Sequence, residues 1–234
     1  MSDAELTKKL EEYLKEYGHG YDSKASAFIR DNFLRYYHDF EHIDILSQIY
    51  SHISVLSDDR DVYKKFMNFI NEKYGLNQDI LEVGSGFFPT LAEKIDTYQQ
   101  SINKGSITAI DPLLIPTKLG NVKLCKSSFS SNMSLKNYTL VTSMYPCEST
   151  VRIIESANAQ DKDFSLLTCG CTHFPDYELY YGGYSTVEDW QNYLYRLAKK
   201  TSKSDRTIDI DYLSDKEVTT PIISSRKKVK TKMQ

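Results

Sequence analysis

The sequence predicts an α/β protein in which a mostly parallel sheet follows an N-terminal helical region. From Asp79 onward, short apolar runs alternate with helical patterns, which is typical of parallel strands joined by helices. The last two apolar runs, 207–212 and 221–225, are joined by a short polar segment that is too brief for a crossover. These two strands must therefore be antiparallel, and we expect seven strands with the last one antiparallel.

The residues before this pattern have helical periodicity and show no strand pattern. Apolar residues recur at helical spacing over 5–17, over a second run from about 23 to 53, and over 60–74, where Gly75 ends the pattern. This region is too small to fold stably by itself. The expected organisation is an N-terminal helical cap at 1–76, an α/β domain at 77–226 and a basic tail at 227–234.

Each later element is bounded by glycine, proline or polar residues. The expected strands cover 80–83, 106–110, 122–126, 138–143, 164–169, 207–212 and 221–225. The expected helices cover 89–100, 147–159 and 186–200. The segment 112–120 is too short and too rich in proline for a full helix.

Composition and charge narrow the function classes. The chain has 234 residues, is 40% hydrophobic and carries a net charge of −3, so only its tail favours nucleic acid. It has no run of about 18 apolar residues, a polar N-terminus unlike a secretory signal, and four cysteines without a disulfide pattern. We expect a cytoplasmic protein with a small-molecule substrate. A nucleic-acid role has only the tail in its favour, and oligomeric state does not follow from the sequence.

The turn Gly84–Ser85–Gly86 carries the first chemical signal. It directly follows the strand pattern at 80–83 and precedes a helix that begins near Pro89. The first glycine permits a tight turn, and the second lets the backbone approach a ligand without a Cβ in the way. The following helix points its N–H groups and the positive end of its dipole toward that ligand. In this context the turn predicts nucleotide binding, whereas Gly-x-Gly alone would be weak evidence.

Asp111 stands at the end of the second expected strand, 106–110. Ligands of open α/β sheets bind at the carboxyl ends of the strands, and a carboxylate there can accept both hydroxyl hydrogens of a ribose. The structural alternative is an Asp-Pro turn, because Pro112 follows. The order of the two motifs favours the ribose role.

Together these residues resemble the class I S-adenosylmethionine-dependent methyltransferases, which have a Rossmann-like fold. The family has an acid two positions before the first glycine, where Glu82 stands, and a ribose-binding acid after the second strand, where Asp111 stands. Its sheet has seven strands with the last inserted antiparallel. The resemblance implies S-adenosylmethionine as cofactor, held by Glu82, Gly84, Ser85, Gly86, Phe87, Pro89, Asp111, Pro112, Ser128, Phe129, Ser143 and Met144.

The chain departs from the family pattern at two points of this site. Phe87–Phe88–Pro89 stands in place of the usual third glycine, and the run 126–129 lacks the acid that contacts the adenine amine in many members. A serine hydroxyl or a backbone carbonyl could make that contact instead.

Residues 143–148 follow the fourth strand, where family members carry out their chemistry. Tyr145 is the candidate that lines the transfer site, and Glu148 is a candidate general base. The alternative for Glu148 is that it only complements the dipole of the next helix. Cys147, Cys169, Cys171 and His173 lack zinc-site spacing, and we expect no metal.

Three other functions remain open from the sequence. The run Gly84 to Pro89 also resembles the loop of nicotianamine-synthase-like enzymes, which transfer an aminocarboxypropyl group from S-adenosylmethionine. A nicotinamide-dependent oxidoreductase is disfavoured by Glu82 and by the antiparallel last strand. A non-catalytic nucleotide-binding fold is the third alternative. The aromatic segment 174–190 is either a loop over the site or a packing surface for the N-terminal helices.

Overall fold

The computed structural model describes residues 2–17, 60–86, 89–114, 119–146, 149–168, 187–213 and 221–228 of the chain. Its contacts divide the chain into two units, 1–62 and 63–234. In the first unit, helix α1 (Asp3–Tyr17) begins with a capping box. The N–H of Ser2 donates to Glu5 Oε2 at 2.7 Å, and the N–H of Glu5 donates to Ser2 Oγ at 3.3 Å. The helical run predicted for 23–53 lies outside the described residues.

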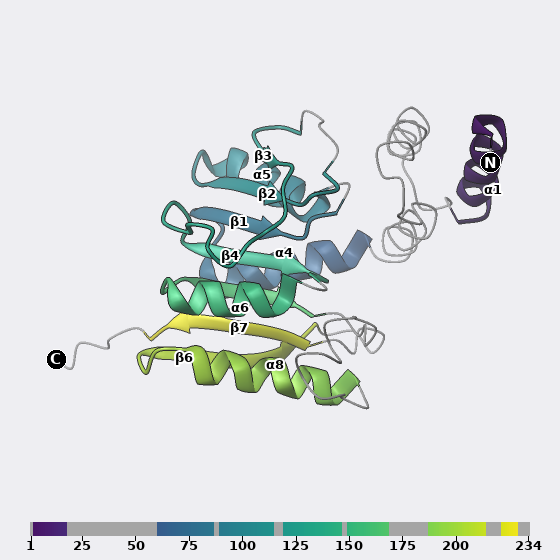
Figure 1. Ribbon diagram of the computed structural model, residues 1–234. Coiled ribbons are helices and arrows are strands. Elements are labelled where there is room, and N and C mark those ends of the chain that lie inside the picture. Colours follow the sequence, from purple (N-terminus) through teal and green to yellow (C-terminus); the bar gives the residue numbers. More distant parts are fainter. Residues whose placement is uncertain are drawn as a thin grey trace. The chain divides into compact units, whose positions relative to one another are not determined.

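The second unit contains one sheet of seven strands, ordered β3-β2-β1-β4-β5-β7-β6 (Figure 1). The strands are β1 (Asp79–Val83), β2 (Ser106–Ile110), β3 (Lys123–Cys125), β4 (Leu140–Met144), β5 (Asp163–Leu167), β6 (Arg206–Tyr212) and β7 (Pro221–Lys227). All neighbours from β3 to β5 pair parallel, and β7 pairs antiparallel with both β5 and β6. The predicted α/β fold is therefore confirmed, with its last strand inserted antiparallel between two parallel ones.

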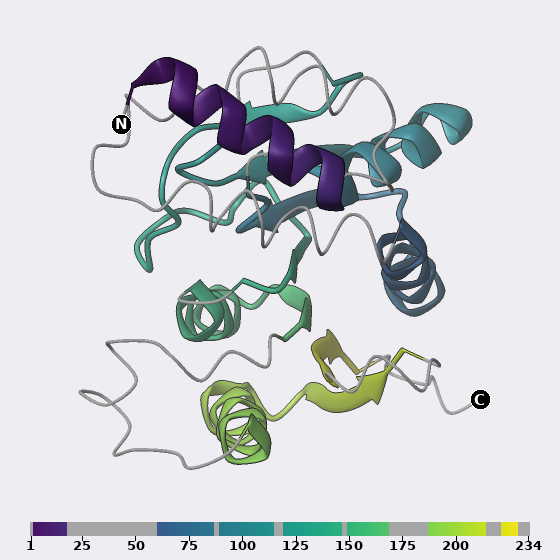
Figure 2. The same cartoon turned by 90° about the vertical axis from the view of Figure 1, so that its right-hand side faces the viewer.

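Helices cover both faces of this sheet. Beside α1, the described helices are α4 (Arg60–Tyr74), α5 (Thr90–Ile102), α6 (Ser149–Ala159) and α8 (Val187–Thr201). Helices α4 and α5 lie on one face, and α6 and α8 lie on the other (Figure 2). No described helix is long and apolar enough to cross a membrane.

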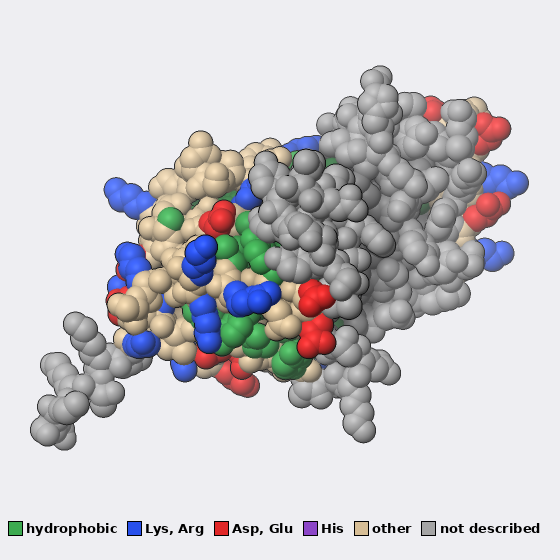
Figure 3. All heavy atoms as spheres, turned by 60° about the horizontal axis from the view of Figure 1, so that its bottom comes forward, with side chains coloured by type: hydrophobic (Ala, Val, Ile, Leu, Met, Phe, Trp, Pro, Cys, Tyr) green, Lys and Arg blue, Asp and Glu red, His purple; other side chains and the backbone are tan. Residues whose placement is uncertain are grey.

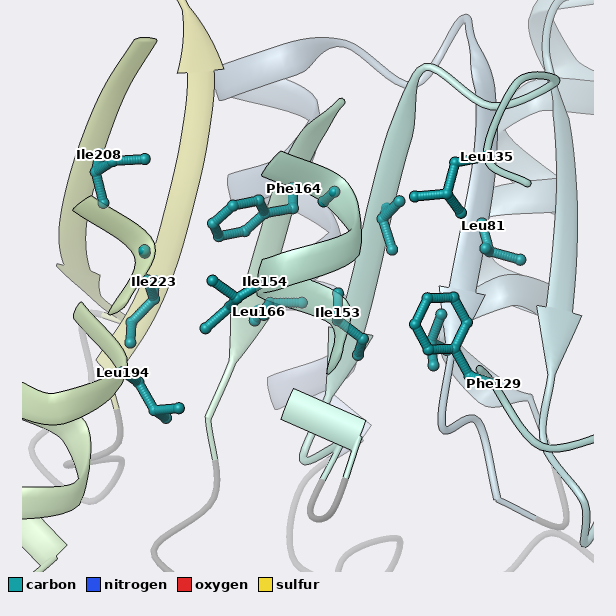
Figure 4. Packing of buried hydrophobic residues seen from close by; sticks show 14 of the residues in the cluster. Leu81, Phe129, Leu135, Ile153, Ile154, Phe164, Leu166, Leu194, Ile208 and Ile223 are labelled. Atoms are coloured by element: carbon teal, nitrogen blue, oxygen red, sulfur yellow. The ribbon is translucent and has the colours of Figure 1, made fainter. Parts of the chain in front are cut away.

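One hydrophobic core lies between the sheet and the α6–α8 layer. Leu81, Phe164 and Ile223 project from three strands toward Ile154 of α6 and Leu194 of α8 (Figure 4). All five side chains are fully buried. Burying one such side chain stabilises the fold by about 1.5–3 kcal/mol, so this layer fixes the strands that carry the site. Blue Lys and Arg side chains gather on the face shown in Figure 3. Arg152 of α6 and Arg196, Lys199 and Lys200 of α8 are exposed.

Helix α4 is attached to the opposite face of the sheet by polar contacts at its C-terminal end. Lys73 Nζ lies 2.9 Å from Asp209 Oδ2 and 2.7 Å from Asp211 Oδ2, both on β6. The hydroxyl of Tyr74 is 2.8 Å from the carbonyl oxygen of Phe164. Gly75 ends the helix with a φ of 75°, a left-handed conformation that suits glycine. These contacts join α4 to the sheet, and the second unit begins at Tyr63, before the predicted domain boundary at residue 76.

Several predicted element bounds shift by one or two residues. Strand β3 is shorter than the predicted 122–126, and β4 begins at Leu140 where 138 was expected. Helix α5 begins at Thr90 and ends at Ile102, and the N–H of its C-cap residue Asn103, which has a φ of 51°, donates to the Gln100 and Gln99 carbonyls. Between β2 and β3 the described residues form turns and no helix, as the sequence predicts.

Candidate functional site

The site lies at the carboxyl edge of the sheet, meaning the edge at which the parallel strands end. The glycine turn, Gly84–Gly86, leaves β1 with φ angles of 72° at Gly84 and 67° at Gly86. Both values lie in the left-handed region that favours glycine. The N–H of Gly84 donates to the carbonyl of Ile110 at 2.9 Å, which ties the turn to the end of β2. A Cβ at Gly84 would lie 3.4 Å from the Cα of Pro146, so the turn also packs closely against the end of β4.

Asp111 joins the glycine turn to the end of β2. Its Oδ2 accepts the N–H of Gly86 at 2.9 Å, and its Oδ1 accepts the N–H of Leu113 at 2.7 Å. The residue is only 8% exposed. A carboxylate has room for about four hydrogen bonds, so each oxygen of Asp111 can accept one more donor. These contacts place Asp111 beside the glycine turn, and its predicted role as the ribose-binding acid stays a prediction.

Glu82 lies within the sheet, under the start of α5. Its Oε2 accepts the N–H of Ala92 at 3.1 Å. Pro89, the N-cap residue of α5, makes no side-chain capping bond, so Glu82 satisfies one of the N–H groups that the helix start leaves unpaired. Burial, reinforced by the charge of Asp111, raises the pKa of Glu82 to about 8. Glu82 therefore holds helix α5 against the strand that ends in the glycine turn.

The end of β4 forms the second wall of the site. The hydroxyl of Ser143 donates to the carbonyl of Val83, which links β4 to β1 beside the glycine turn. Tyr145 continues the pairing with β5, because its N–H donates to the carbonyl of Leu167 at 2.8 Å. Its φ is 55°, a conformation that costs a non-glycine residue about 1–2 kcal/mol. Strain of this kind is common at ligand sites, because neighbouring contacts must maintain it.

Ser85 is the one residue of the glycine turn with a polar side chain. It is 8% exposed, and its buried hydroxyl oxygen has no hydrogen-bond partner among the residues that the structure describes. An unsatisfied buried hydroxyl costs roughly 1–3 kcal/mol. A ligand that hydrogen-bonds to this hydroxyl would recover that cost.

The other predicted site residues have different surroundings. Met144 and Pro89 are buried at the carboxyl edge, whereas Pro112 and Ser128 are exposed. Phe129 is 4% exposed, and its ring packs near Leu81 in the core between the sheet and the α6–α8 layer (Figure 4). Several residues named in the sequence analysis lie outside the described residues. These are the site candidates Phe87 and Glu148, the cysteine and histidine set Cys147, Cys169, Cys171 and His173, and most of the aromatic segment 174–190. Within the described ranges, no group of three or more His, Cys, Asp or Glu side chains is placed to hold a metal ion.

Tyr63 is a buried residue near this site that the sequence argument did not single out. It belongs to α4 and is 9% exposed. Burial and the charges of Glu82 and Tyr145 raise its pKa, so its phenol lies within electrostatic reach of both residues. In the sequence, Tyr63 is simply one apolar position of a helical pattern, and only the packing of α4 reveals its neighbours.

Comparisons with known proteins give similarities of low identity. No family model matches the chain, and no curated protein matches it. Among solved structures, the chain is similar to 1,6-didemethyltoxoflavin-N1-methyltransferase of Burkholderia thailandensis, with 14% identity over 88% of this chain and 90% of that chain, and a TM-score of 0.47. It is also similar to an S-adenosylmethionine-dependent methyltransferase of Clostridium acetobutylicum, with 14% identity over 79% and 100% of the two chains and a TM-score of 0.45.

A variant of a nicotianamine synthase is a further similar structure, with 9% identity over 95% of this chain and 71% of that chain, and a TM-score of 0.40. Because these identities and TM-scores are low, the fold is defined by the strand order and pairing directions described above.

Proposed function

We propose that the chain is an S-adenosylmethionine-dependent methyltransferase with a small-molecule acceptor. The observation that supports this most is the pair of buried carboxyl groups at the glycine turn. Glu82 is 2% exposed and Asp111 is 8% exposed. Both accept backbone N–H groups, and neither forms an ion pair with a cation in the part of the chain that the structure describes. A site of this kind suits a ligand that brings its own positive charge.

The residues at this edge fit the parts of S-adenosylmethionine. Asp111 has acceptor capacity left for the ribose hydroxyl groups, and the Ser85 hydroxyl has no partner within the described part of the chain. Gly84 and Gly86 offer backbone without side chains, and the sulfonium and ammonium charges of the ligand would favour the ionised forms of Glu82 and Asp111. When bound, the cofactor supplies an electrophilic methyl group.

The protein's own part in such a reaction is alignment and the exclusion of water. Tyr145, held at the end of β4 next to the glycine turn, lines the acceptor side of the site in this proposal. Glu148 is proposed as the group that takes a proton from the acceptor or orients it. These two roles rest on chain position and on the family resemblance.

Calorimetry tests the cofactor directly. We expect the chain to bind S-adenosylmethionine and S-adenosylhomocysteine but not NAD. The variant Asp111→Ala should weaken S-adenosylmethionine binding about ten-fold or more, because it removes a charge-assisted acceptor. Asp205→Ala is the matched control, since Asp205 is an exposed carboxylate distant in the fold, at the turn before β6. Unchanged affinity in Asp111→Ala would contradict the ribose role, and binding of none of the three ligands would contradict the proposed function.

The by-product of turnover separates methyl transfer from the alternative aminocarboxypropyl transfer. Methyl transfer releases S-adenosylhomocysteine, whereas aminocarboxypropyl transfer releases methylthioadenosine. Chromatography of the nucleosides formed with a mixture of small-molecule acceptors therefore identifies the transferred group. Release of methylthioadenosine would replace the proposed reaction with the alternative one.

A further inference from the structure

Two short segments, 196–206 and 226–228, concentrate positive charge in an otherwise acidic chain. Together they contain eight Lys or Arg residues and one acid, Asp205, whereas the net charge of the whole chain is −3. The first segment covers the end of α8 and the start of β6, and the second covers the end of β7 and the residue after it. A local positive potential of this kind attracts anionic partners even to a protein whose net charge is negative.

The fold brings the two segments side by side. Arg206 pairs with Lys227 in the antiparallel ladder of β6 and β7. The N–H of Lys228 donates to the carbonyl of Asp205 at 2.9 Å, and its Nζ donates to the carbonyl of Ser204 at 2.8 Å. The first two residues of the predicted basic tail, Lys227 and Lys228, therefore lie against the turn that follows α8.

Exposed cations cover this surface, which we call the basic corner. Arg196, Lys199 and Lys200 lie on one exposed face of α8, because residues three and four positions apart are neighbours on a helix. Figure 3 shows blue Lys and Arg side chains gathered on this side of the molecule. The basic corner consists of six exposed side chains: Arg196, Lys199, Lys200, Lys203, Lys227 and Lys228.

Structural roles account for only part of this charge. Lys199 and Lys200 stand in the last turn of α8, where cations complement the helix dipole. Lys203 and Lys227 share the carboxylate of Asp161, at 3.6 Å and 2.8 Å. That carboxylate already contacts a buried cation of β6, so it does not need both lysines. The basic corner therefore has more positive charge than the fold uses.

Arg196 and Lys200 are the cations of the basic corner that are most available to a partner. They are one helical turn apart, and neither forms an ion pair within the described ranges. Both can turn toward an anion without losing an existing ion pair. Lys199, between them, lies 4.4 Å from the ring centroid of Tyr195, which holds it on the same helix surface.

The chemistry of the basic corner indicates which kind of partner it fits. Among the described residues, the exposed large hydrophobic side chains are Ile102 of α5 and Tyr212 at the other end of β6, so the basic corner has none. The core of a protein interface is apolar and aromatic, and a helix that lies on a membrane buries an apolar face. Interfaces with nucleic acid are instead polar and strongly positive. From Arg196 to Lys203 the row covers about 10 Å, which matches about three phosphates of one strand.

We propose that the basic corner binds nucleic acid through its phosphate backbone, without reading the base sequence. Lys and Arg contacts to phosphate fix the position of a strand and carry no sequence information. The basic corner lies where β6 begins, whereas the glycine turn lies where the parallel strands end. The two are separated by the length of a strand such as β5, which has five residues and is about 16 Å long. The nucleic acid is therefore a docking partner and not the methyl acceptor, and this role does not rest on the proposed function.

Fluorescence anisotropy with a labelled single-stranded RNA of about 20 nucleotides and mixed sequence measures this binding on the full chain. We expect the logarithm of the affinity to fall linearly with the logarithm of the salt concentration between about 50 and about 200 mM, because phosphate contacts release counterions. The variant Arg196→Gln/Lys200→Gln keeps good helix-forming residues and removes two charges. It should weaken binding about ten-fold at the lower salt concentration and reduce the salt slope by about 1.4.

Lys104→Gln/Lys123→Gln is the matched control, with the same change in net charge. Both lysines are exposed, and Lys123 belongs to β3, at the opposite end of the sheet from β6. This variant should bind RNA as the wild type does. Equal losses in the two double variants would show an effect of net charge alone and would overturn the proposal, as would a wild type that binds no RNA. Binding to phosphatidylserine vesicles in preference to RNA would also overturn it and point to a membrane partner.

Asp111→Ala separates this proposal from the proposed function. It should bind RNA as the wild type does, and Arg196→Gln/Lys200→Gln should keep the wild-type affinity for S-adenosylmethionine. A loss of RNA binding in Asp111→Ala would place the nucleic acid at the candidate site and overturn the docking role. If the wild type binds no S-adenosylmethionine but loses RNA binding only in Arg196→Gln/Lys200→Gln, the proposed function fails while the role of the basic corner stands.

Discussion

The two edges of the sheet treat buried charge in opposite ways. At the amino edge, where the parallel strands begin, Arg206 has a side chain that is 1% exposed and that contacts Asp161 at 2.9 Å and also Asp163. Lys227 adds a second cation, 2.8 Å from Asp161. At the carboxyl edge, Glu82 and Asp111 are buried, and among the described residues backbone N–H groups donate to both.

The pKa values follow this difference. Lys227 and Arg206 lower the pKa of Asp161 to about 2, whereas burial raises that of Glu82 to about 8. The amino edge is thus neutralised within the protein, as a structural charge cluster should be. At the carboxyl edge, no Lys or Arg of the described residues forms an ion pair with Glu82 or Asp111, so that place is open to the cation of a ligand. This contrast separates a charge cluster that holds the fold together from one that is available for a ligand.

The largest effect should follow the loss of the buried cation at the amino edge. Arg206→Met leaves two aspartates without their buried partner, and also removes the bond from Arg206 Nε to Ser225 Oγ at 2.8 Å. We expect the free energy of unfolding to fall by about 3–5 kcal/mol. Urea denaturation measures this loss. Lys203→Met is the control, because its side chain is 54% exposed and its loss should cost less than about 0.5 kcal/mol. Equal losses in both variants would erase the distinction between buried and exposed cations at this edge.

The next effect concerns the pH dependence of stability at the carboxyl edge. The pKa of Glu82 rises from 4.5 to about 8 on folding, so between these values the folded chain binds more protons than the unfolded chain. The contribution of Glu82 to stability therefore falls as pH rises through this window. The glutamine in Glu82→Gln cannot ionise. The free energy of unfolding of this variant should match that of the wild type at about pH 5 and exceed it by on the order of 3 kcal/mol at about pH 9.

Chemical denaturation of both proteins at the two pH values checks this prediction. Glutamine keeps an oxygen that can accept the N–H of Ala92, so the start of α5 should stay capped. A wild type whose stability relative to Glu82→Gln does not change with pH would show that Glu82 is ionised in the free protein.

A smaller effect is expected at the glycine turn itself. Gly84→Ala places a Cβ 3.4 Å from the Cα of Pro146, in a residue with a φ of 72°. The strained conformation should cost about 1–2 kcal/mol. Ser85→Ala, one residue later, removes a hydroxyl that has no partner among the described residues, so its stability should stay within about 0.5 kcal/mol of the wild type or rise slightly. Thermal unfolding of the two variants measures both changes, and a destabilised Ser85→Ala would mean that this hydroxyl already serves the fold.

The sequence predicts the framework of the site well where the signal is local. Gly84 and Asp111 stand out because each directly follows a strand pattern, and parallel strands bring their carboxyl ends to one edge. The role of Glu82 in holding α5 was not predicted, because a helix N–H and a strand carboxylate ten residues apart meet only through the tertiary fold. Tyr63 was missed for the same reason. Phe129 shows the opposite limit, since an aromatic residue after a strand suits a core as well as a ligand.

The place of β7 in the sheet has a consequence for how the chain is made. Strand β6 contacts the rest of the sheet through β7, which is the last strand in chain order but lies between β5 and β6. As the chain leaves the ribosome, β1 to β5 can pair in turn, whereas β6 has no neighbour until residues 221–227 have been synthesised. Until then, the edges of β5 and β6 that will pair with β7 expose unpaired backbone N–H and C=O groups. The slowest and most aggregation-prone stage of biosynthesis should therefore be the insertion of this final strand.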